Sequence, residues 1–222
     1  MCTPAPPPRR RPTYHHGDLR SALIDTALEL IAEEGVHGFS VAEAARRSGV
    51  SISAPYRHFA DRDALLAAVA VRAYEELLGR FTAAISAQRA PADQLAAASA
   101  AYVRFAAERR AMFEVLFGAG LDKVRYPPLE VAATQVVQVL VAVAARLAPN
   151  ADEHLAWALV QAMAGLAQGH ATLLLDGAFG LPGEALDLAA DRAASATRAL
   201  VRGRSLLFAG VETTNGPATS HG

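Results

Sequence analysis

The chain lacks the residues that build covalent or metal-centred frameworks. Among its 222 residues, Cys2 is the only cysteine. A single thiol excludes a disulfide within the chain and a cysteine-based metal site, and we expect a cytoplasmic protein. Aromatic residues are 6% of the chain and the formal net charge is −1, so no overall basic field indicates a nucleic-acid partner. A small local patch on a neutral protein can still bind DNA.

The motifs of common enzymes are also missing. The sequence has no Gly-x-Ser-x-Gly elbow, no phosphate-binding loop, no His-Glu-x-x-His and no paired carboxylates, so we expect neither an enzyme nor a cofactor. His15 and His16 beside Asp18 could form a metal site, but an arm leading to DNA is the favoured interpretation, and we expect no metal. The most apolar run, 131–148, is interrupted by glutamine and arginine and falls short of a span of ~20 apolar residues. It predicts a buried helix and no membrane partner.

Strong helix formers dominate what is present. Hydrophobic residues make up 52% of the chain, with long runs rich in alanine, leucine and valine. Such runs predict an all-α protein of about nine helices, large enough for two helical subdomains. The first four helices are expected to begin near Asp18, Ser40, Ser51 or Ser53, and Asp61, and the others near Pro91, Met112, Pro127 and residues 152 and 184.

The two ends of the chain contain little that could form a core. Residues 1–13 hold five prolines and three arginines and predict a disordered or extended arm. Its arginines, Arg9 to Arg11, could reach a minor groove or phosphates, or the arm could be idle. Residues 211–222 predict a flexible tail.

Two short helices joined by a glycine turn predict a helix-turn-helix motif over about residues 41–60. Ala45 is small where the helices would cross, and Gly49, four residues later, suits the turn. An ordinary helical hairpin has the same spacing. The residues that follow therefore decide between the two interpretations.

From Asp18 to Val69 the sequence resembles the tetracycline-repressor (TetR) family of bacterial regulators. The resemblance is carried by Gly35 after the first helix, by FSVAEAARRSGVS, by the YRHF ending and by FADRDALL. The family usually has Phe-x-x-Lys-x-x-Leu after Tyr-x-His-Phe, and here arginine, Arg62, takes the place of the lysine. The resemblance implies an N-terminal three-helix DNA-binding domain at 14–80 and a ligand-binding and dimerising bundle at 81–210.

The expected DNA contacts are of two kinds. N-terminal residues of a recognition helix read base edges, whereas phosphate contacts position the protein. The residues expected at the bases are Ile52, Ser53 and Ala54. The residues that the resemblance places at phosphates are Ser40, Tyr56, His58 and Arg62. Ser51, Arg47 and Arg57 complete the predicted surface, although either arginine could simply be a solvated charge.

Pro55 falls in the first turn of the expected recognition helix. Few backbone N–H groups have intrahelical partners there, so we expect the loss of about one hydrogen bond at most. The family often has an apolar residue such as leucine at this place, and the proline ring can fill it. We therefore expect the recognition helix to keep its geometry, with Phe59 in the core.

The second half of the chain predicts a ligand cavity. RRAMFEVLF and LAQGHATLLLDG resemble a TetR C-terminal subclass named for a Trp-His-Gly pattern, with Gln168 and Gly169 where that pattern has His-Gly. Aromatic, methionine and lone polar residues inside apolar helices are typical of small-molecule sites, although core packing is the alternative for each of them. The candidates are Tyr102, Phe105, Met112, Phe113, Phe117, Trp157, Met163, Gln168 and His170.

The last two helices carry repeats that suit helix packing. In the last one, Leu186, Ala193, Leu200 and Leu207 recur every seven residues, as do Ala189, Ala196 and Gly203. The preceding helix repeats Leu159, Leu166 and Leu173 and offers Gly165 and Gly169 as another close face. These faces could be intramolecular core, but the resemblance implies a homodimer interface built from the last two helices of each subunit.

The favoured function is a homodimeric transcriptional repressor. We expect it to leave a pseudo-palindromic operator when it binds a small apolar or aromatic effector. The main rival is a helical-bundle enzyme or carrier of an apolar metabolite that does not bind DNA. An activator or architectural DNA-binding protein without a ligand is the third possibility.

Overall fold

The computed structural model describes residues 16–147, 153–180 and 182–205, and every element in these ranges is helical. The predicted arm at 1–13 and tail at 211–222 lie outside the described residues, as do His15 and Leu207. The elements are α1 (His16–Gly38), α2 (Val41–Arg47), the 3-10 helix η1 (Pro55–Arg57), α3 (Arg62–Ser86), α4 (Pro91–Glu108), α5 (Arg110–Gly118), the 3-10 helix η2 (Lys123–Arg125), α6 (Pro127–Ala145), α7 (Glu153–Leu175) and α8 (Pro182–Arg202). The prediction of an all-α fold is confirmed.

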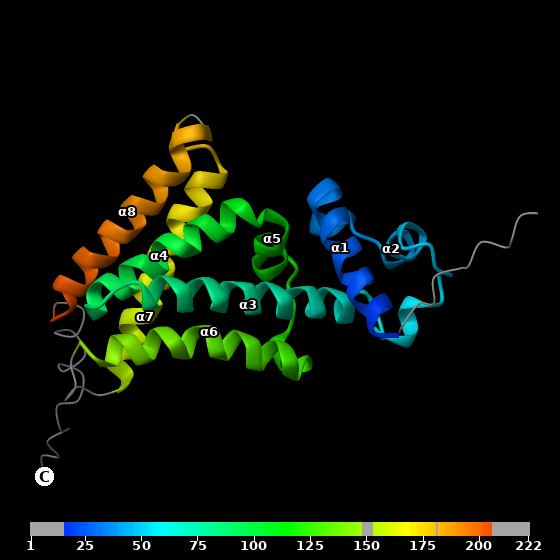
Figure 1. Ribbon diagram of the computed structural model, residues 1–222, viewed down its shortest axis with the longest axis horizontal. Coiled ribbons are helices and arrows are strands. Elements are labelled where there is room, and N and C mark those ends of the chain that lie inside the picture. Colours follow the sequence, from blue (N-terminus) through cyan, green and yellow to red (C-terminus); the bar gives the residue numbers. More distant parts are fainter. Residues whose placement is uncertain (1–15, 148–152, 181, 206–222) are drawn as a thin grey trace, which may run out of the picture.

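The molecule is elongated, with α1, α2 and η1 at one end and the bundle of α4 to α8 at the other (Figure 1). Helix α3 joins the two parts: it contacts α1 near its beginning and packs along α4 and α6 in the bundle. Its 25 residues correspond to a length of about 37 Å. The division expected between residues 80 and 81 falls inside this helix and remains a prediction.

Local sequence signals account for where several helices begin. Ser40 Oγ accepts a hydrogen bond from Glu43 N at 3.3 Å, and Asp61 Oδ1 accepts one from Ala64 N at 2.7 Å. These side chains satisfy N–H groups that a helix start leaves without partners. Prolines occupy the first turns of α4 and α6, where a missing N–H costs little. The predicted starts at Ser40, Asp61, Pro91 and Pro127 are confirmed.

Helix α1 does not stop at Gly35 as predicted but kinks there and continues to Gly38. Gly35 has φ 74° and ψ 166°, a conformation that essentially only glycine adopts. Beyond the kink, Val36 N donates a hydrogen bond of 2.6 Å to Glu114 Oε1 on α5. A Cβ at Gly35 would lie 3.2 Å from the same oxygen. The glycine therefore allows α1 to meet α5 at close range.

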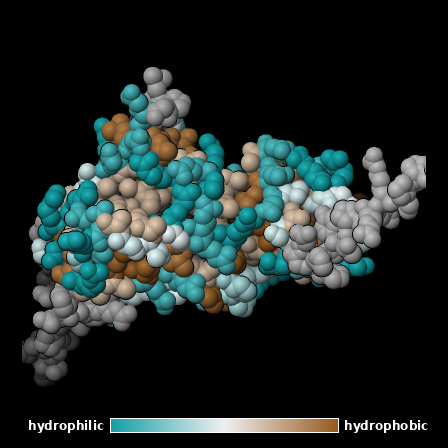
Figure 2. Space-filling model, viewed as in Figure 1, coloured by the Kyte–Doolittle hydropathy of each residue, from teal (hydrophilic) through white to brown (hydrophobic). Residues whose placement is uncertain are grey.

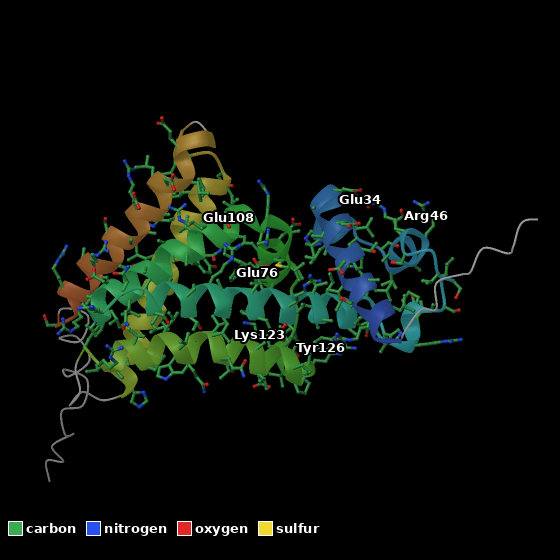
Figure 3. The ribbon with its side chains drawn as sticks, viewed as in Figure 1. Glu34, Arg46, Glu76, Glu108, Lys123 and Tyr126 are labelled. Carbon is green, nitrogen blue, oxygen red and sulfur yellow. The ribbon has the colours of Figure 1, made fainter. Side chains whose placement is uncertain are left out.

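An ion-pair cluster joins α3 to the junction of α4 and α5, and Figure 3 labels two of its members, Glu76 on α3 and Glu108 at the end of α4. Glu76 Oε1 accepts from Arg80 Nη2 at 2.9 Å and from Arg109 Nε at 2.8 Å, and Arg80 Nη1 donates to Glu108 Oε2 at 2.7 Å. The Arg80 guanidinium also lies 5.6 Å from the ring centroid of Phe105, which is fully buried. Shared partners hold α3 and the junction of α4 and α5 together more firmly than isolated surface pairs would.

Helices α6 and α7 are long and apolar enough to cross a membrane by length and composition alone. In the structure α6 packs on α3 and α7, while α7 also packs on α4 and α8. Both helices contribute buried residues to the common hydrophobic core, among them Leu140 and Val160. Part of their apolar character therefore serves the packing of the bundle.

We predict that Gly35→Ala lowers the free energy of unfolding by about 1–3 kcal/mol, because alanine is strained at this φ and its methyl group would crowd Glu114. Gly79→Ala is the matched control: Gly79 lies within α3, and a Cβ there meets nothing within 4 Å. The control should gain about 0.5–1 kcal/mol from helix propensity. Urea denaturation of both variants measures the difference, and equal effects would contradict the role assigned to Gly35.

Candidate nucleic-acid interface and ligand cavity

The predicted helix-turn-helix begins as expected. Helix α2 ends at Arg47 with Ser48 as its C-cap, and Gly49 takes the turn with φ 68°. Val50 N donates a hydrogen bond of 3.1 Å to Ala45 O, and this bond closes the turn against α2. Thr26 Oγ1 lies 3.1 Å from Ser48 Oγ and ties α1 to the end of α2.

The recognition segment is shorter than predicted, and the expectation that it keeps its helix geometry is wrong. Ala54 N donates to Ser51 O at 2.9 Å, and the only helical element between α2 and α3 is η1, Pro55–Arg57. Pro55 has no N–H to give to Ser51 O, so an α-helical bond cannot form there and the carbonyl accepts from Ala54 instead. The segment is a series of tight turns closed by Phe59 N, which donates to Pro55 O at 2.9 Å.

The tip that these turns form is largely open to solvent. Ile52 and Tyr56 are 63% and 52% exposed, unusual values for large apolar and aromatic side chains. Pro55 and Phe59 are buried beneath them, as predicted for Phe59. The structure gathers the predicted DNA contacts here: Ser51, Ile52, Ser53, Tyr56 and Arg57 are exposed, and Ala54 and His58 are half-buried.

The two remaining predicted arginines are held by protein partners. Arg47 donates to Glu33 on α1 at 2.6 and 2.8 Å and to Glu43 at 3.2 Å. The hydrogen bond from Arg46, together with that from Arg47, lowers the pKa of Glu43 to about 2. Arg62 donates to the carbonyls of Phe39, at 3.2 Å, and Val36. Arg47 and Arg62 thus fix the α1–α2 corner, and their phosphate contacts remain predictions.

A cavity of about 440 Å³ lies in the bundle between α3, α4, α5, α6 and α7. Among the residues that the structure describes, no charged side chain lines it. Its lining is Tyr74, Leu77, Phe81, Ala98, Ser99, Tyr102, Phe117, Val136, Val137, Leu140, Val160, Met163, Ala164, Gly165, Ala167 and Gln168. This volume and this apolar lining are typical of small-molecule sites.

Four of the nine predicted ligand residues line the cavity: Tyr102, Phe117, Met163 and Gln168. They come from α4, α5 and α7, and the Tyr102 hydroxyl donates a hydrogen bond to Gln168 Oε1. Burial raises the pKa of Tyr102, so its hydroxyl stays protonated at neutral pH. These four residues line the cavity, and their contact with a ligand remains a prediction.

The other five predicted ligand residues do not line the cavity. Phe105 and Met112 are buried in the core, and Phe113 packs behind Phe117 with ring centroids 4.9 Å apart. Trp157 is exposed and precedes the part of α7 that lines the cavity. His170 Nδ1 lies 2.8 Å from Leu166 O, and its ring stacks on Phe179. Residue type alone could not separate a lining position from its neighbours on the same helix.

Sequence reasoning missed several functional positions. The aliphatic lining residues, such as Val136, Val137 and Leu140, carry no signal that distinguishes them from core. Glu114 had one: it is the only acidic residue of the apolar helix α5, and it holds Val36 N. A carboxylate in such a helix needs a partner, and this could have been anticipated.

The repeats of the last two helices divide between core and surface. Ala189 and Ala193 on α8 are fully buried, and Thr197 pairs with Ser99 on α4 through hydroxyl oxygens 2.7 Å apart. This face of α8 is therefore intramolecular core. On α7, by contrast, a Cβ at Gly165 or Gly169 would meet nothing within 4 Å.

Comparison with known sequences identifies the family. Residues 23–69 match the family described as bacterial regulatory proteins, tetR family, and residues 95–200 match the family described as tetracyclin repressor-like, C-terminal domain. The two matches together cover more than half of the chain. The chain belongs to the TetR family. The Trp-His-Gly subclass remains a prediction.

Relatives of the TetR chain extend this result. It is 29% identical over 121 residues to YobS, an uncharacterised HTH-type transcriptional regulator of Bacillus subtilis (strain 168), a match that covers 54% of this chain and 61% of that relative. A protein of unknown function from Rhodococcus sp. RHA1 has a similar structure, with a TM-score of 0.68, 28% identity and coverage of 85% of this chain and 98% of that one. FadR of Bacillus subtilis, solved in complex with stearoyl-CoA, has a TM-score of 0.63 and 16% identity over 82% of this chain and 96% of its own.

We predict that Arg57→Ala weakens binding to a short mixed-sequence DNA duplex several-fold at moderate salt. Loss of one phosphate contact should make the slope of log affinity against log salt less steep by about 1. Arg89→Ala is the matched control, because Arg89 is an exposed arginine after the opposite end of α3. Fluorescence anisotropy at several salt concentrations measures both slopes, and equal slopes for wild type and Arg57→Ala would remove Arg57 from the interface.

Proposed function

We propose that this TetR-family chain is a DNA-binding transcriptional repressor that a small apolar or aromatic effector releases from its operator. The observation that carries the proposal is the course of α3. Tyr74, Leu77 and Phe81 on this helix line the cavity, while Arg62 in its first turn holds the α1–α2 corner. One rigid element therefore connects the cavity with the exposed tip at η1.

A second element makes the same connection. Phe117 on α5 lines the cavity, and Glu114, one turn earlier on α5, binds Val36 N. A ligand that displaces Phe117 acts on the helix that holds the corner of the DNA-binding part. Only a ligand with different affinities for two arrangements of these helices can shift DNA binding.

The fold of the relatives supports an apolar ligand. FadR of Bacillus subtilis shares the fold and was solved in complex with stearoyl-CoA, a molecule with a long apolar chain. The cavity described above has no charged lining residue and is bounded mostly by aliphatic and aromatic side chains. An effector whose inserted part is uncharged and apolar fits this surface best.

We further propose that the protein acts as a homodimer. Two copies would present two recognition segments to half-sites about 34–36 Å apart or a multiple of that distance. In the space-filling view, apolar patches reach the surface of the bundle between hydrophilic residues (Figure 2). Leu173 on α7 is 49% exposed, and the open faces of Gly165 and Gly169 on the same helix permit close approach of a partner helix. Helix α7 is the better candidate for the centre of the interface, because Ala189 and Ala193 of α8 are already buried.

The proposed function predicts that Val137→Phe abolishes the effector response and leaves DNA binding intact. Val137 lines the cavity, so a larger ring there fills the space that the effector needs. Val139→Phe is the control, since Val139 is a half-buried valine of α6 outside the lining. The assay titrates the DNA upstream of the chain's own gene by anisotropy, and small apolar compounds are screened for release of wild type.

An effector should lower the wild-type affinity for this DNA roughly 5- to 150-fold, the usual range of allosteric coupling. A normal response of Val137→Phe would place the effector elsewhere. Tight, salt-dependent DNA binding that no compound alters would leave a DNA-binding protein without a ligand switch.

The dimer proposal predicts that Leu173→Arg yields monomers that bind operator DNA weakly, because a buried unpaired charge destabilises an interface. Val124→Arg is the control: Val124 on η2 is 74% exposed and lies on a different part of the molecule. Light scattering with both variants gives the molar mass. Dimeric Leu173→Arg protein would exclude this face of α7 from the interface.

A further inference from the structure

The cavity has few polar groups, and only some of them have hydrogen-bond partners among the described residues. Ser99 shares a hydrogen bond with Thr197, and the Tyr102 hydroxyl donates one to Gln168 Oε1. Within the described part of the chain, no group accepts a hydrogen bond from Gln168 Nε2. The Tyr74 hydroxyl also makes no hydrogen bond there, and Tyr74 and Tyr102 are close enough for an electrostatic effect of one on the other.

The Tyr102 hydrogen bond fixes which part of the Gln168 amide is free. An amide offers one oxygen and two N–H donors. Because Tyr102 is a donor to the oxygen, the two N–H groups are the unused part of a side chain that lines the cavity. The unpaired groups of the described lining are thus an amide nitrogen, which can only donate, and a phenol, which can donate or accept, within otherwise apolar surroundings.

We infer that the Gln168 amide selects an uncharged effector that carries a hydrogen-bond acceptor, such as a ketone, ester or amide carbonyl, on an apolar or aromatic body. This inference rests on the proposed function and names the chemical class of its ligand. A cation would meet the amide N–H groups and no carboxylate among the described lining residues. A carboxylate would lose its hydration without an arginine or lysine among them, since Lys123 lies 5.3 Å from the centroid of the Tyr74 ring but does not line the cavity.

Tyr102 and Gln168 lie on the packed helices α4 and α7, and their hydrogen bond orients the Gln168 amide. A glutamine with a free amide turns in the cavity and presents either its oxygen or its nitrogen. The hydrogen bond between α4 and α7 holds one orientation, so the donors are positioned before a ligand arrives. Tyr102 acts through Gln168 and is a positioning residue.

The test uses four compounds with one aromatic skeleton: propylbenzene, propiophenone, 3-phenylpropanoate and 3-phenylpropylammonium. Isothermal titration calorimetry measures their affinity for the full chain without DNA. For wild type we expect both neutral compounds to bind and the two ions to bind at least about 100-fold more weakly than propiophenone. In Gln168→Leu, the ratio of propiophenone to propylbenzene affinity should fall roughly tenfold, because the carbonyl loses its donor, while propylbenzene still binds.

Gln161→Leu is the matched control, since Gln161 is an exposed glutamine of α7 outside the lining, and its ratio should equal that of wild type. Gln168→Met, which keeps the length of the side chain, replaces Gln168→Leu if the latter is unfolded by circular dichroism. An unchanged ratio in the Gln168 variant, tighter binding of either ion than of the ketone, or no binding of the neutral compounds overturns the inference. DNA release is measured separately, so the expected binding pattern without any release would contradict the proposed function and leave the inference intact.

Discussion

The hydrogen bond between Glu114 and the backbone N–H of Val36 joins the two parts of the molecule at the kink of α1. Its 2.6 Å distance depends on Gly35, because a side chain there would crowd the carboxylate. On the other side of the same corner, Arg62 holds the carbonyls of Val36 and Phe39. The orientation of α2 and the exposed tip therefore follows from contacts that α3 and α5 make, and both helices also line the cavity.

Much of the fold follows from signals that act over a few residues. Ser40, Asp61, Pro91 and Pro127 could be recognised as helix starts because a cap or a first-turn proline depends only on its near neighbours. Pro55 shows the limit of such reasoning. The effect of Pro55 depends on which N–H group donates to the carbonyl of Ser51 in its place. The missing proline N–H alone does not determine that donor.

The cavity shows a different limit. Tyr102 and Gln168 were predictable because a polar side chain inside an apolar helix needs a partner. The aliphatic lining was not, since valine and leucine at a cavity wall have the same spacing as valine and leucine in a packed core. Whether a position faces a void depends on how five helices come together. Trp157 was conspicuous by type, yet it lies outside the lining.

The unbroken course of α3 gives the molecule a lever. The helix runs without interruption from Phe81, the lining residue farthest along it, to Arg62 at the α1–α2 corner, a length of about 28 Å. A rotation of about 5° at the cavity end displaces the far end by roughly 2.5 Å, simply from that length. Hydrogen bonds span about 3 Å, so a movement of that size breaks polar contacts at the tip. A ligand much smaller than the protein can thus disengage a surface that it never touches.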